Sequence, residues 1–158
     1  MKTSDLPRLV TAIFVSEFAG IVGSVFTIPA IPNWYAALDK PFLNPPSWIF
    51  GPVWTILYFL MGISVFLIWR KGLKRKEVKV AICIFILQLI LNIVWSVFFF
   101  GFHDLGMAFI EIVVLWLAIF GTMSVFYKIS MLATYLLIPY ILWVTFAGYL
   151  NYAIWALN

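Results

Sequence analysis

Residues 70–79 read RKGLKRKEVK and hold six of the ten basic side chains of the chain, between two long apolar segments. Of the 158 residues, 65% are hydrophobic and only 10% are charged, whereas a soluble domain carries about 25% charged residues. This is too little charge to cover a water-exposed surface, so we expect a fold whose outside faces the lipid bilayer. The net charge of +4 does not indicate a nucleic-acid partner, because basic loops orient membrane proteins.

Outward from this stretch, hydropathy predicts five membrane-spanning helices. The first apolar segment follows basic residues, as a signal peptide does, but it is long enough to span a bilayer and contains Glu17, so we interpret it as a retained helix. We therefore predict an all-α, integral membrane bundle of five transmembrane helices in a single domain, residues 1–158. Each segment is close to the roughly 20 residues that cross the hydrocarbon: 9–31, 48–69, 80–102, 106–127 and 132–156.

The connectors between the predicted helices are short, with one exception. Residues 32–47 contain four prolines, and we expect no continuous helix there. At the next turn on the same side, Asp104 is well placed to cap the fourth helix. The four prolines are Pro32, Pro41, Pro45 and Pro46.

The charges predict an orientation for these helices. If the spans alternate, nine of the ten basic residues fall on one side: Lys2, Arg8, the six in 70–79, and Lys128. The other side holds only Lys40. The positive-inside rule then puts the N-terminus in the cytoplasm and the C-terminus outside. The small size and this asymmetry suggest a bacterial plasma membrane.

Side chains that commonly bind metals or act as nucleophiles are scarce. Cys83 is the only cysteine and His103 the only histidine. A disulfide within the chain and a metal site built from a Cys or His cluster are therefore excluded. There is also no Gly-rich phosphate loop and no Ser/His/Asp set. We expect no required cofactor.

Polar side chains inside the predicted spans are energetically costly, so their presence calls for a structural or functional explanation. Glu17 and Glu111 fall at different depths, so we do not pair them as an acid and a base. The simplest interpretation of each is a neutral carboxyl group hydrogen-bonded to a neighbouring helix. Gln88, Asn92 and Ser96 recur every four residues on one face of the third helix. They either form interhelical hydrogen bonds or line a cavity.

Small side chains form two rows on the first helix. Such rows let helix backbones approach closely, and they predict packing either inside the bundle or across a dimer. The rows are Ala12, Ser16, Gly20 and Ser24, and beside them Ala19, Gly23 and Thr27.

Aromatic and amide side chains of three helices reach similar depths beneath the proline-rich connector. Flat indole faces, one small residue and one or two amides suit a planar hydrophobic ligand with a few polar atoms. A closely packed aromatic core is the alternative. The residues concerned are Trp54, Asn92, Trp95, Trp143, Ala147, Leu150 and Asn151.

Several ordered motifs are similar to those of one membrane-protein family. Residues 34–41 read WYAALDKP, 45–48 read PPSW, 51–58 read GPVWTILY and 139–143 read PYILW. Between them stand Gln88, Asn92, Trp95 and the run FFFG at 98–101. From the first helix to the C-terminus, the chain resembles the tryptophan-rich sensory protein family, also called translocator protein or peripheral-type benzodiazepine receptor.

The resemblance implies a five-helix membrane protein, usually a homodimer. It implies binding of porphyrins such as protoporphyrin IX and of synthetic isoquinoline carboxamide or benzodiazepine ligands. Some members promote light-dependent breakdown of protoporphyrin IX, for which Trp54 and Trp143 would be the catalytic indoles. Members also bind cholesterol, but the basic residue that ends the sterol motif of animal relatives has no counterpart after Trp155, which argues against specific sterol binding. Carried over by motif, the ligand-binding residues would be Tyr35 and Pro45 in a lid loop and Trp54, Asn92, Trp95, Trp143, Ala147 and Leu150 in the pocket.

We therefore expect a receptor-like membrane protein that binds porphyrins in an aromatic pocket. It would regulate or degrade tetrapyrroles under light or oxidative stress. The alternative is a small proton-coupled multidrug exporter in which Glu17 carries the proton. Five spans rather than four, and the proline-rich lid, count against the exporter.

Overall fold

The computed structural model describes residues 5–158, so Lys2, which contributes to the charge asymmetry, lies outside the described residues. Every helix or strand element among the described residues is helical, and five helices are long and apolar enough to cross a membrane. The predicted all-α class with five membrane spans is confirmed. In chain order the elements are α1 (Asp5–Ala30), η1 (Ile31–Tyr35), η2 (Ser47–Ile49), α2 (Phe50–Trp69), α3 (Lys76–Ser96), η3 (Val97–Gly101), α4 (Leu105–Tyr127), α5 (Met131–Tyr135) and α6 (Ile138–Leu157).

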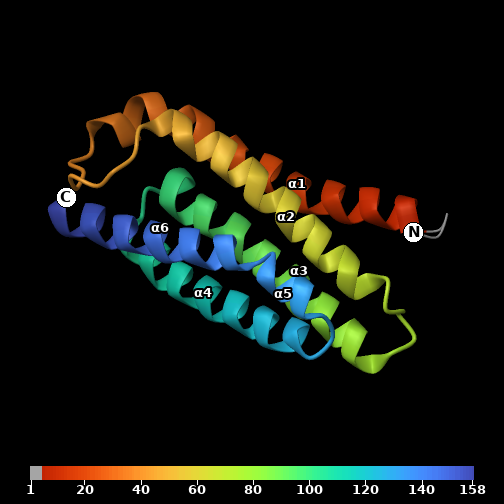
Figure 1. Cartoon of the computed structure of the whole chain (residues 1–158). Coiled ribbons are helices and arrows are strands. Elements are labelled where there is room, and N and C mark those ends of the chain that lie inside the picture. Colours follow the sequence, from red (N-terminus) through yellow and green to blue (C-terminus); the bar gives the residue numbers. More distant parts are fainter. Residues whose placement is uncertain (1–4) are drawn as a thin grey trace.

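The two ends of the bundle carry different connections (Figure 1). The start of α1, the turn between α2 and α3 and the link from α4 to α5 share one end, which we call the basic end because it holds residues 70–79. The connector 36–46, the turn between α3 and α4 and the C-terminus share the other, which we call the loop end. The connections therefore alternate as the charge pattern predicts.

The first helix is longer than its apolar segment predicts. α1 runs past Pro29 and continues as η1, a π-helical turn that contains Pro32. The predicted span 9–31 therefore ends too early, because helical structure continues to Tyr35, while residues 32–47 do not form one continuous helix, as expected. A proline removes one helical hydrogen bond and crowds the preceding turn, and a local π turn is one adjustment that accommodates it in a membrane helix. The irregular connector is therefore shorter than the sequence predicts.

The last span is two helices rather than the single predicted helix 132–156. α5 and α6 are joined through Leu136 and Leu137. Pro139 lies in the first turn of α6, where its missing N–H leaves no helical bond unmade. In one continuous helix its ring would meet the carbonyl group of residue 135. Ser64 Oγ donates a hydrogen bond of 2.6 Å to the carbonyl oxygen of Ala133, which ties α5 to α2.

The turn between α3 and α4 is fixed from both sides. Asp104 caps α4 as predicted, because its side chain accepts a hydrogen bond of 2.9 Å from the backbone N–H of Met107. His103 has a φ of 58°, and its ring stacks on Trp34 with the centroids 4.2 Å apart. This stack ties the turn to η1 at the loop end.

Small residues let α1 lie close to its neighbours. A Cβ atom on Gly62 would come within 2.6 Å of the Cα atom of Ile13, and one on Gly20 within 2.5 Å of Cε2 of Tyr58. The small-residue rows therefore pack inside the bundle, one of the two roles that the sequence leaves open. The outer face of α1 is apolar and exposed: Leu6, Val10, Phe14, Phe18 and Val25.

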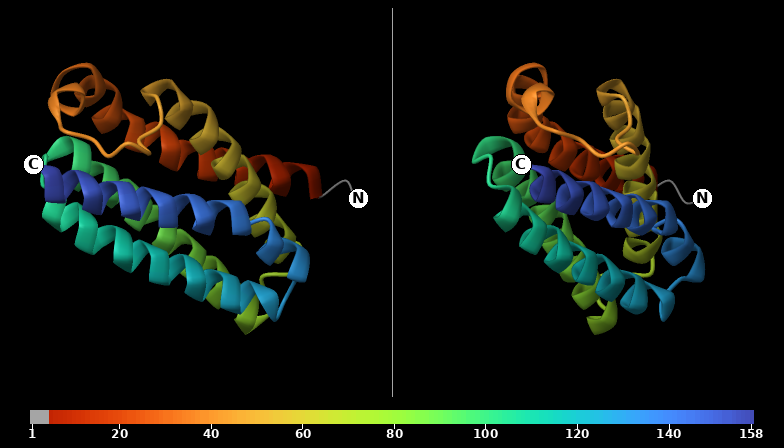
Figure 2. Two further views of the ribbon diagram at one scale, coloured as in Figure 1. Left: turned by 60° about the vertical axis from the view of Figure 1, so that its left-hand side comes forward. Right: turned by 90° about the vertical axis from the view of Figure 1, so that its left-hand side faces the viewer.

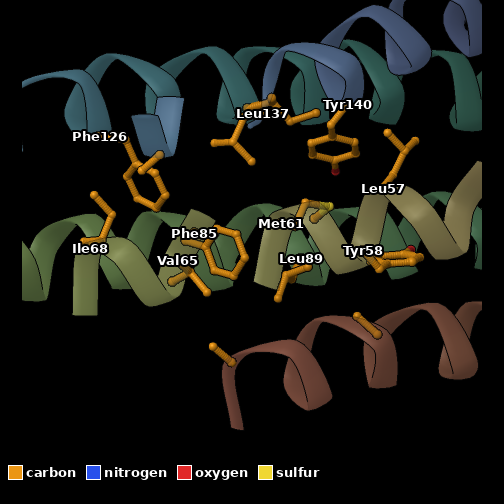
Figure 3. Packing of buried hydrophobic residues seen from close by; sticks show 14 of the residues in the cluster. Leu57, Tyr58, Met61, Val65, Ile68, Phe85, Leu89, Phe126, Leu137 and Tyr140 are labelled. Atoms are coloured by element: carbon orange, nitrogen blue, oxygen red, sulfur yellow. The ribbon is translucent and has the colours of Figure 1, made fainter. Parts of the chain in front are cut away.

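The main core lies on the inner sides of α2, α3, α4 and α6 (Figure 3). In this layer Leu57 of α2 lies towards Tyr140 of α6, and Val65 of α2 lies beside Phe85 of α3. Towards the loop end the outer parts of α1 and α2 diverge, as the right-hand view of Figure 2 shows. The candidate site lies where they separate.

Candidate ligand-binding cavity

A cavity of about 330 Å³ lies at the loop end, with walls from α1, α2, α3 and α6. Its volume is within the roughly 300–1,000 Å³ of small-molecule sites. η1 and η3 contribute Tyr35 and Phe99. Most of the wall is apolar or aromatic; among the described residues it holds one carboxyl group, Glu17, and two side-chain amides, Asn92 and Asn151.

The structure brings most of the expected ligand-binding residues together. Pro45 alone among them does not line the cavity; it lies in the connector, where its carbonyl oxygen accepts a hydrogen bond of 3.1 Å from Asn44 Nδ2. That these residues bind a ligand stays a prediction. Those that line the cavity are Tyr35, Trp54, Asn92, Trp95, Trp143, Ala147 and Leu150.

Aromatic rings form facing walls because they recur at helical spacing. On α2, Trp54 stacks on Tyr58 with centroids 5.5 Å apart. At the α3–η3 boundary, Trp95 and Phe99 are 5.1 Å apart. The two indoles predicted to be catalytic, Trp54 and Trp143, both line the cavity from different helices. Their catalytic role stays a prediction, while their placement offers a flat ligand two indole faces.

A chain of hydrogen bonds joins three helices beside the cavity. Tyr58 Oη donates to Asn92 Oδ1, and Asn92 Nδ2 donates to Tyr140 Oη over 3.0 Å. Tyr140 Oη in turn donates to Gln88 Oε1 over 2.8 Å. Both interpretations of the polar stripe on α3 therefore apply: Gln88 and Asn92 form interhelical bonds, and Asn92 and Ser96 line the cavity. A network of this kind holds the buried rings in one arrangement.

Of the three tryptophans that line the cavity, Trp95 and Trp143 differ in the hydrogen bonding of their indole N–H groups. Trp95 Nε1 donates to Asn151 Oδ1 over 3.0 Å, and Asn151 Nδ2 donates to the carbonyl oxygen of Leu105 over 2.9 Å. Trp143 Nε1 is buried and donates to no described residue. An unsatisfied buried donor is unfavourable, and because its nitrogen is buried in the protein, this N–H is not presented to the cavity.

The connector 36–46, which we call the lid, is tied down at two points. Tyr35 Oη donates to Asn44 Oδ1 over 2.8 Å, and Lys40 Nζ lies 4.9 Å from the centroid of the Tyr35 ring. Asn158 accepts a hydrogen bond from the backbone N–H of Asp39 and donates one to its carbonyl oxygen, both over 3.0 Å. The C-terminal residue thus clamps the lid.

The two acids within the spans differ in position. Glu17 lines the cavity and Glu111 does not. The prediction that each carboxyl group is hydrogen-bonded is wrong for both acids: no hydrogen bond joins Glu17 to another described residue, and the two buried oxygens of Glu111 have no partner among those residues. The buried tyrosine hydroxyl groups donate elsewhere: Tyr58 donates to Asn92 and Tyr140 donates to Gln88, so neither donates to Glu111. Sequence patterns do not reveal such a choice of acceptor.

The cavity opens sideways between α1 and α2. The residues that both line it and are exposed mark this mouth: Ile21 and Ile28 on α1, Ser47 on η2, and Gly51 and Thr55 on α2. All five lie within the segments long and apolar enough to span a membrane. The mouth therefore faces the region that lipid occupies. The lid itself does not line the cavity, but Tyr35 and Ser47 on either side of it do.

Two comparisons with known proteins agree. The model of the TspO/MBR family matches residues 12–156. The tryptophan-rich protein TspO of Chlorobaculum tepidum is 44% identical over 139 residues, which cover 88% of each chain. The protein of the same name from Archaeoglobus fulgidus is 41% identical over 98% of this chain and 99% of its own. The human translocator protein is 39% identical over 87% of this chain and 82% of its own.

Proposed function

The chain belongs to the TspO/MBR family, and from this premise we propose that its cavity binds tetrapyrroles such as protoporphyrin IX and planar synthetic ligands of the isoquinoline carboxamide and benzodiazepine types. The family and the five helices make it a multi-pass membrane protein with a receptor-like role. The single observation that carries the ligand proposal is the placement of Trp54 and Trp143 in the walls of one cavity. Two indole faces suit a flat macrocycle better than a ligand of irregular shape.

The polar groups of the cavity support a ligand with few polar atoms. Trp95 and Asn151 satisfy each other, and the N–H of Trp143 is buried away from the cavity, so few polar groups of the wall are left for a ligand. Binding would therefore depend mainly on buried apolar area, at about 25 cal/mol per Å². Orientation would come from a small number of hydrogen bonds.

Quenching of protein fluorescence by protoporphyrin IX in the dark tests this function. Trp143→Ala should weaken binding, since it removes one aromatic wall of the cavity. Trp155→Ala is the matched control, because Trp155 is half-exposed and does not line the cavity. Equal affinities in both variants would exclude this cavity as the porphyrin site.

Light-dependent breakdown of the bound porphyrin is a second candidate activity. An indole next to an excited porphyrin could donate an electron, with dioxygen as the oxidant, and Trp54 and Trp143 both line the cavity. Under illumination the porphyrin spectrum should bleach faster with the native protein than with denatured protein. If Trp54→Phe and Trp143→Phe bleach at the native rate, the indoles have no catalytic role.

The exporter alternative rests on Glu17, which lines the cavity. If Glu17 carried a proton in exchange for a drug, Glu17→Gln would abolish pH-gradient-driven uptake into proteoliposomes. Uptake that is absent in the native protein removes this alternative, whatever the result for the variant.

The basic end faces the cytoplasm of a plasma membrane in our proposal. The cluster at residues 70–79 supports this orientation under the positive-inside rule, with Lys40 at the loop end. In a Cys83→Ser background, a cysteine at Ser47 should react with an impermeant maleimide in intact cells and one at Lys74 should not. The reverse labelling would invert the orientation.

A homodimer completes the proposed assembly. The exposed apolar face of α1 is available to a second copy and bears Phe14 among other large side chains. A cysteine at Phe14, again in the Cys83→Ser background, should cross-link two copies in native membranes. Absence of cross-links there, and along the same face, would contradict a dimer through α1.

A further inference from the structure

Glu17 is the one charged side chain in the cavity wall among the described residues. It is the lining residue of α1 that lies nearest the basic end, one turn before Ile21 at the mouth. The cavity therefore has a carboxyl group at its inner end and the lid at the other. A flat apolar ligand needs no carboxyl group in its binding site, and the porphyrin proposal assigns no role to Glu17.

The hydroxyl groups around Glu17 are directed elsewhere. Tyr58 Oη donates to Asn92. Ser16 Oγ donates to the carbonyl oxygen of Ala12 over 3.0 Å, and Ser24 Oγ to that of Ile21 over 2.7 Å. No hydrogen bond or ion pair joins Glu17 to another described residue. A carboxyl group at membrane depth without a partner is costly and marks a functional position.

We propose that the inner end of the cavity is a subsite for a protonated amine on a planar aromatic ligand, with the Glu17 carboxylate as its counter-ion. The ligand's ring system would lie against Trp54 and Tyr58, so the subsite rests on the proposed function of the cavity walls. An ammonium or ring N–H⁺ group would supply the charge-assisted hydrogen bond that the protein does not. The adjacent aromatic faces favour a cation as well.

The same charge orients an anionic ligand in the opposite sense. The two carboxylates of protoporphyrin IX would be repelled by Glu17 and would point to the loop end. Lys40 lies there, over the ring of Tyr35. The cavity would thus hold cations and dianions in opposite orientations.

A pair of fluorescent probes separates charge from shape. Proflavine and anthracene share three fused rings, but only proflavine carries a positive charge at neutral pH. The native protein in detergent should bind proflavine more tightly than anthracene. Glu17→Gln should weaken proflavine binding by about 10-fold and leave anthracene binding unchanged. Glu17→Asp, which keeps the carboxylate, should retain the preference for the cation.

Glu111→Gln is the matched control, because it makes the same chemical change at an acid that does not line the cavity; it should leave both affinities unchanged. Proflavine binding that survives Glu17→Gln overturns the proposal. So does an equal loss of both probes, which would mean that Glu17 acts on the cavity's shape. Protoporphyrin IX is titrated in parallel, so that the two proposals are tested separately. If the native protein does not bind protoporphyrin IX, the proposed function is contradicted. The subsite is contradicted only by the absence of a Glu17-dependent preference for proflavine.

Discussion

Replacement of Gly20 by Ala tests whether the contact between α1 and α2 shapes the cavity. The added Cβ atom would lie 2.5 Å from Cε2 of Tyr58, and ordinary contacts begin at 3.4 Å, so the ring must shift by about 0.9 Å. Tyr58 is only 4% exposed and cannot swing into open space. Its displacement would strain the hydrogen bond to Asn92 and move a cavity wall.

The expected free energy follows from three contributions. Overpacking a buried site costs about 1–3 kcal/mol, and a weakened interhelical hydrogen bond about 1 kcal/mol. The gain in helix propensity from Gly to Ala offsets about 1 kcal/mol. We therefore expect Gly20→Ala to lower the free energy of unfolding by about 1–3 kcal/mol and to weaken protoporphyrin IX binding.

Reversible unfolding in mixed detergent micelles measures this change. The matched control is Gly121→Ala on α4, where an added Cβ atom would meet nothing within 4 Å; it should be neutral or slightly stabilising. If Gly20→Ala unfolds like Gly121→Ala and binds the porphyrin like the native protein, the close approach of α1 to Tyr58 does not shape the site.

Three further perturbations test separate parts of the structure. Gly51→Phe should slow porphyrin association, since a Cβ atom there meets nothing within 4 Å and the side chain would fill the mouth. Stopped-flow fluorescence quenching measures the association rate, with Gly121→Phe as the control that should be unchanged. Equal rates in both variants would mean that the porphyrin enters elsewhere. Asn158→Ala should speed amide hydrogen exchange in residues 36–46 and porphyrin release, because it removes both bonds to Asp39; unchanged exchange would show that the clamp is not what holds the lid. Ser64→Ala should lower the free energy of unfolding by about 1–2 kcal/mol, as it leaves the buried carbonyl group of Ala133 without its donor; a neutral effect would mean that α5 needs no tie to α2.

The membrane spans could be predicted because lipid imposes one simple requirement, a long apolar helix. The local backbone structure at each proline could not be predicted in the same way. Pro32 lies inside a π turn and Pro139 lies in the first turn of α6, although both prolines stand in apolar surroundings in the sequence. The difference depends on whether neighbouring helices and the local hydrogen-bond register accommodate the ring, which is a tertiary property.

The site was predictable where helical spacing and depth determine position. Trp54, Asn92 and Trp143 follow from such spacing and all line the cavity. Tyr58 was missed, although its spacing of four from Trp54 was a usable signal. Asn158 had no signal, because its role as a clamp depends on where the lid crosses the C-terminus.

The hydrogen-bond partner of each buried polar side chain was the property that the sequence predicted least well. Glu111 is buried without a partner, and Glu17 lies in the cavity wall. Composition makes the two acids equivalent, since each is one carboxyl group in an apolar span. Only the packing of the helices separates a carboxyl group that can meet a ligand from one that cannot.

Dark titration of purified Ala147→Phe with protoporphyrin IX tests the central claim most directly. Ala147 is 7% exposed and lines the cavity from α6, so a phenyl ring there would occupy the space assigned to the macrocycle. The control is Ala156→Phe, which changes an exposed residue outside the cavity. We predict that porphyrin affinity falls by about 10-fold or more in Ala147→Phe and not in the control. A 10-fold loss corresponds to about 1.4 kcal/mol of binding free energy. Native affinity in Ala147→Phe would show that the pigment binds elsewhere on the protein.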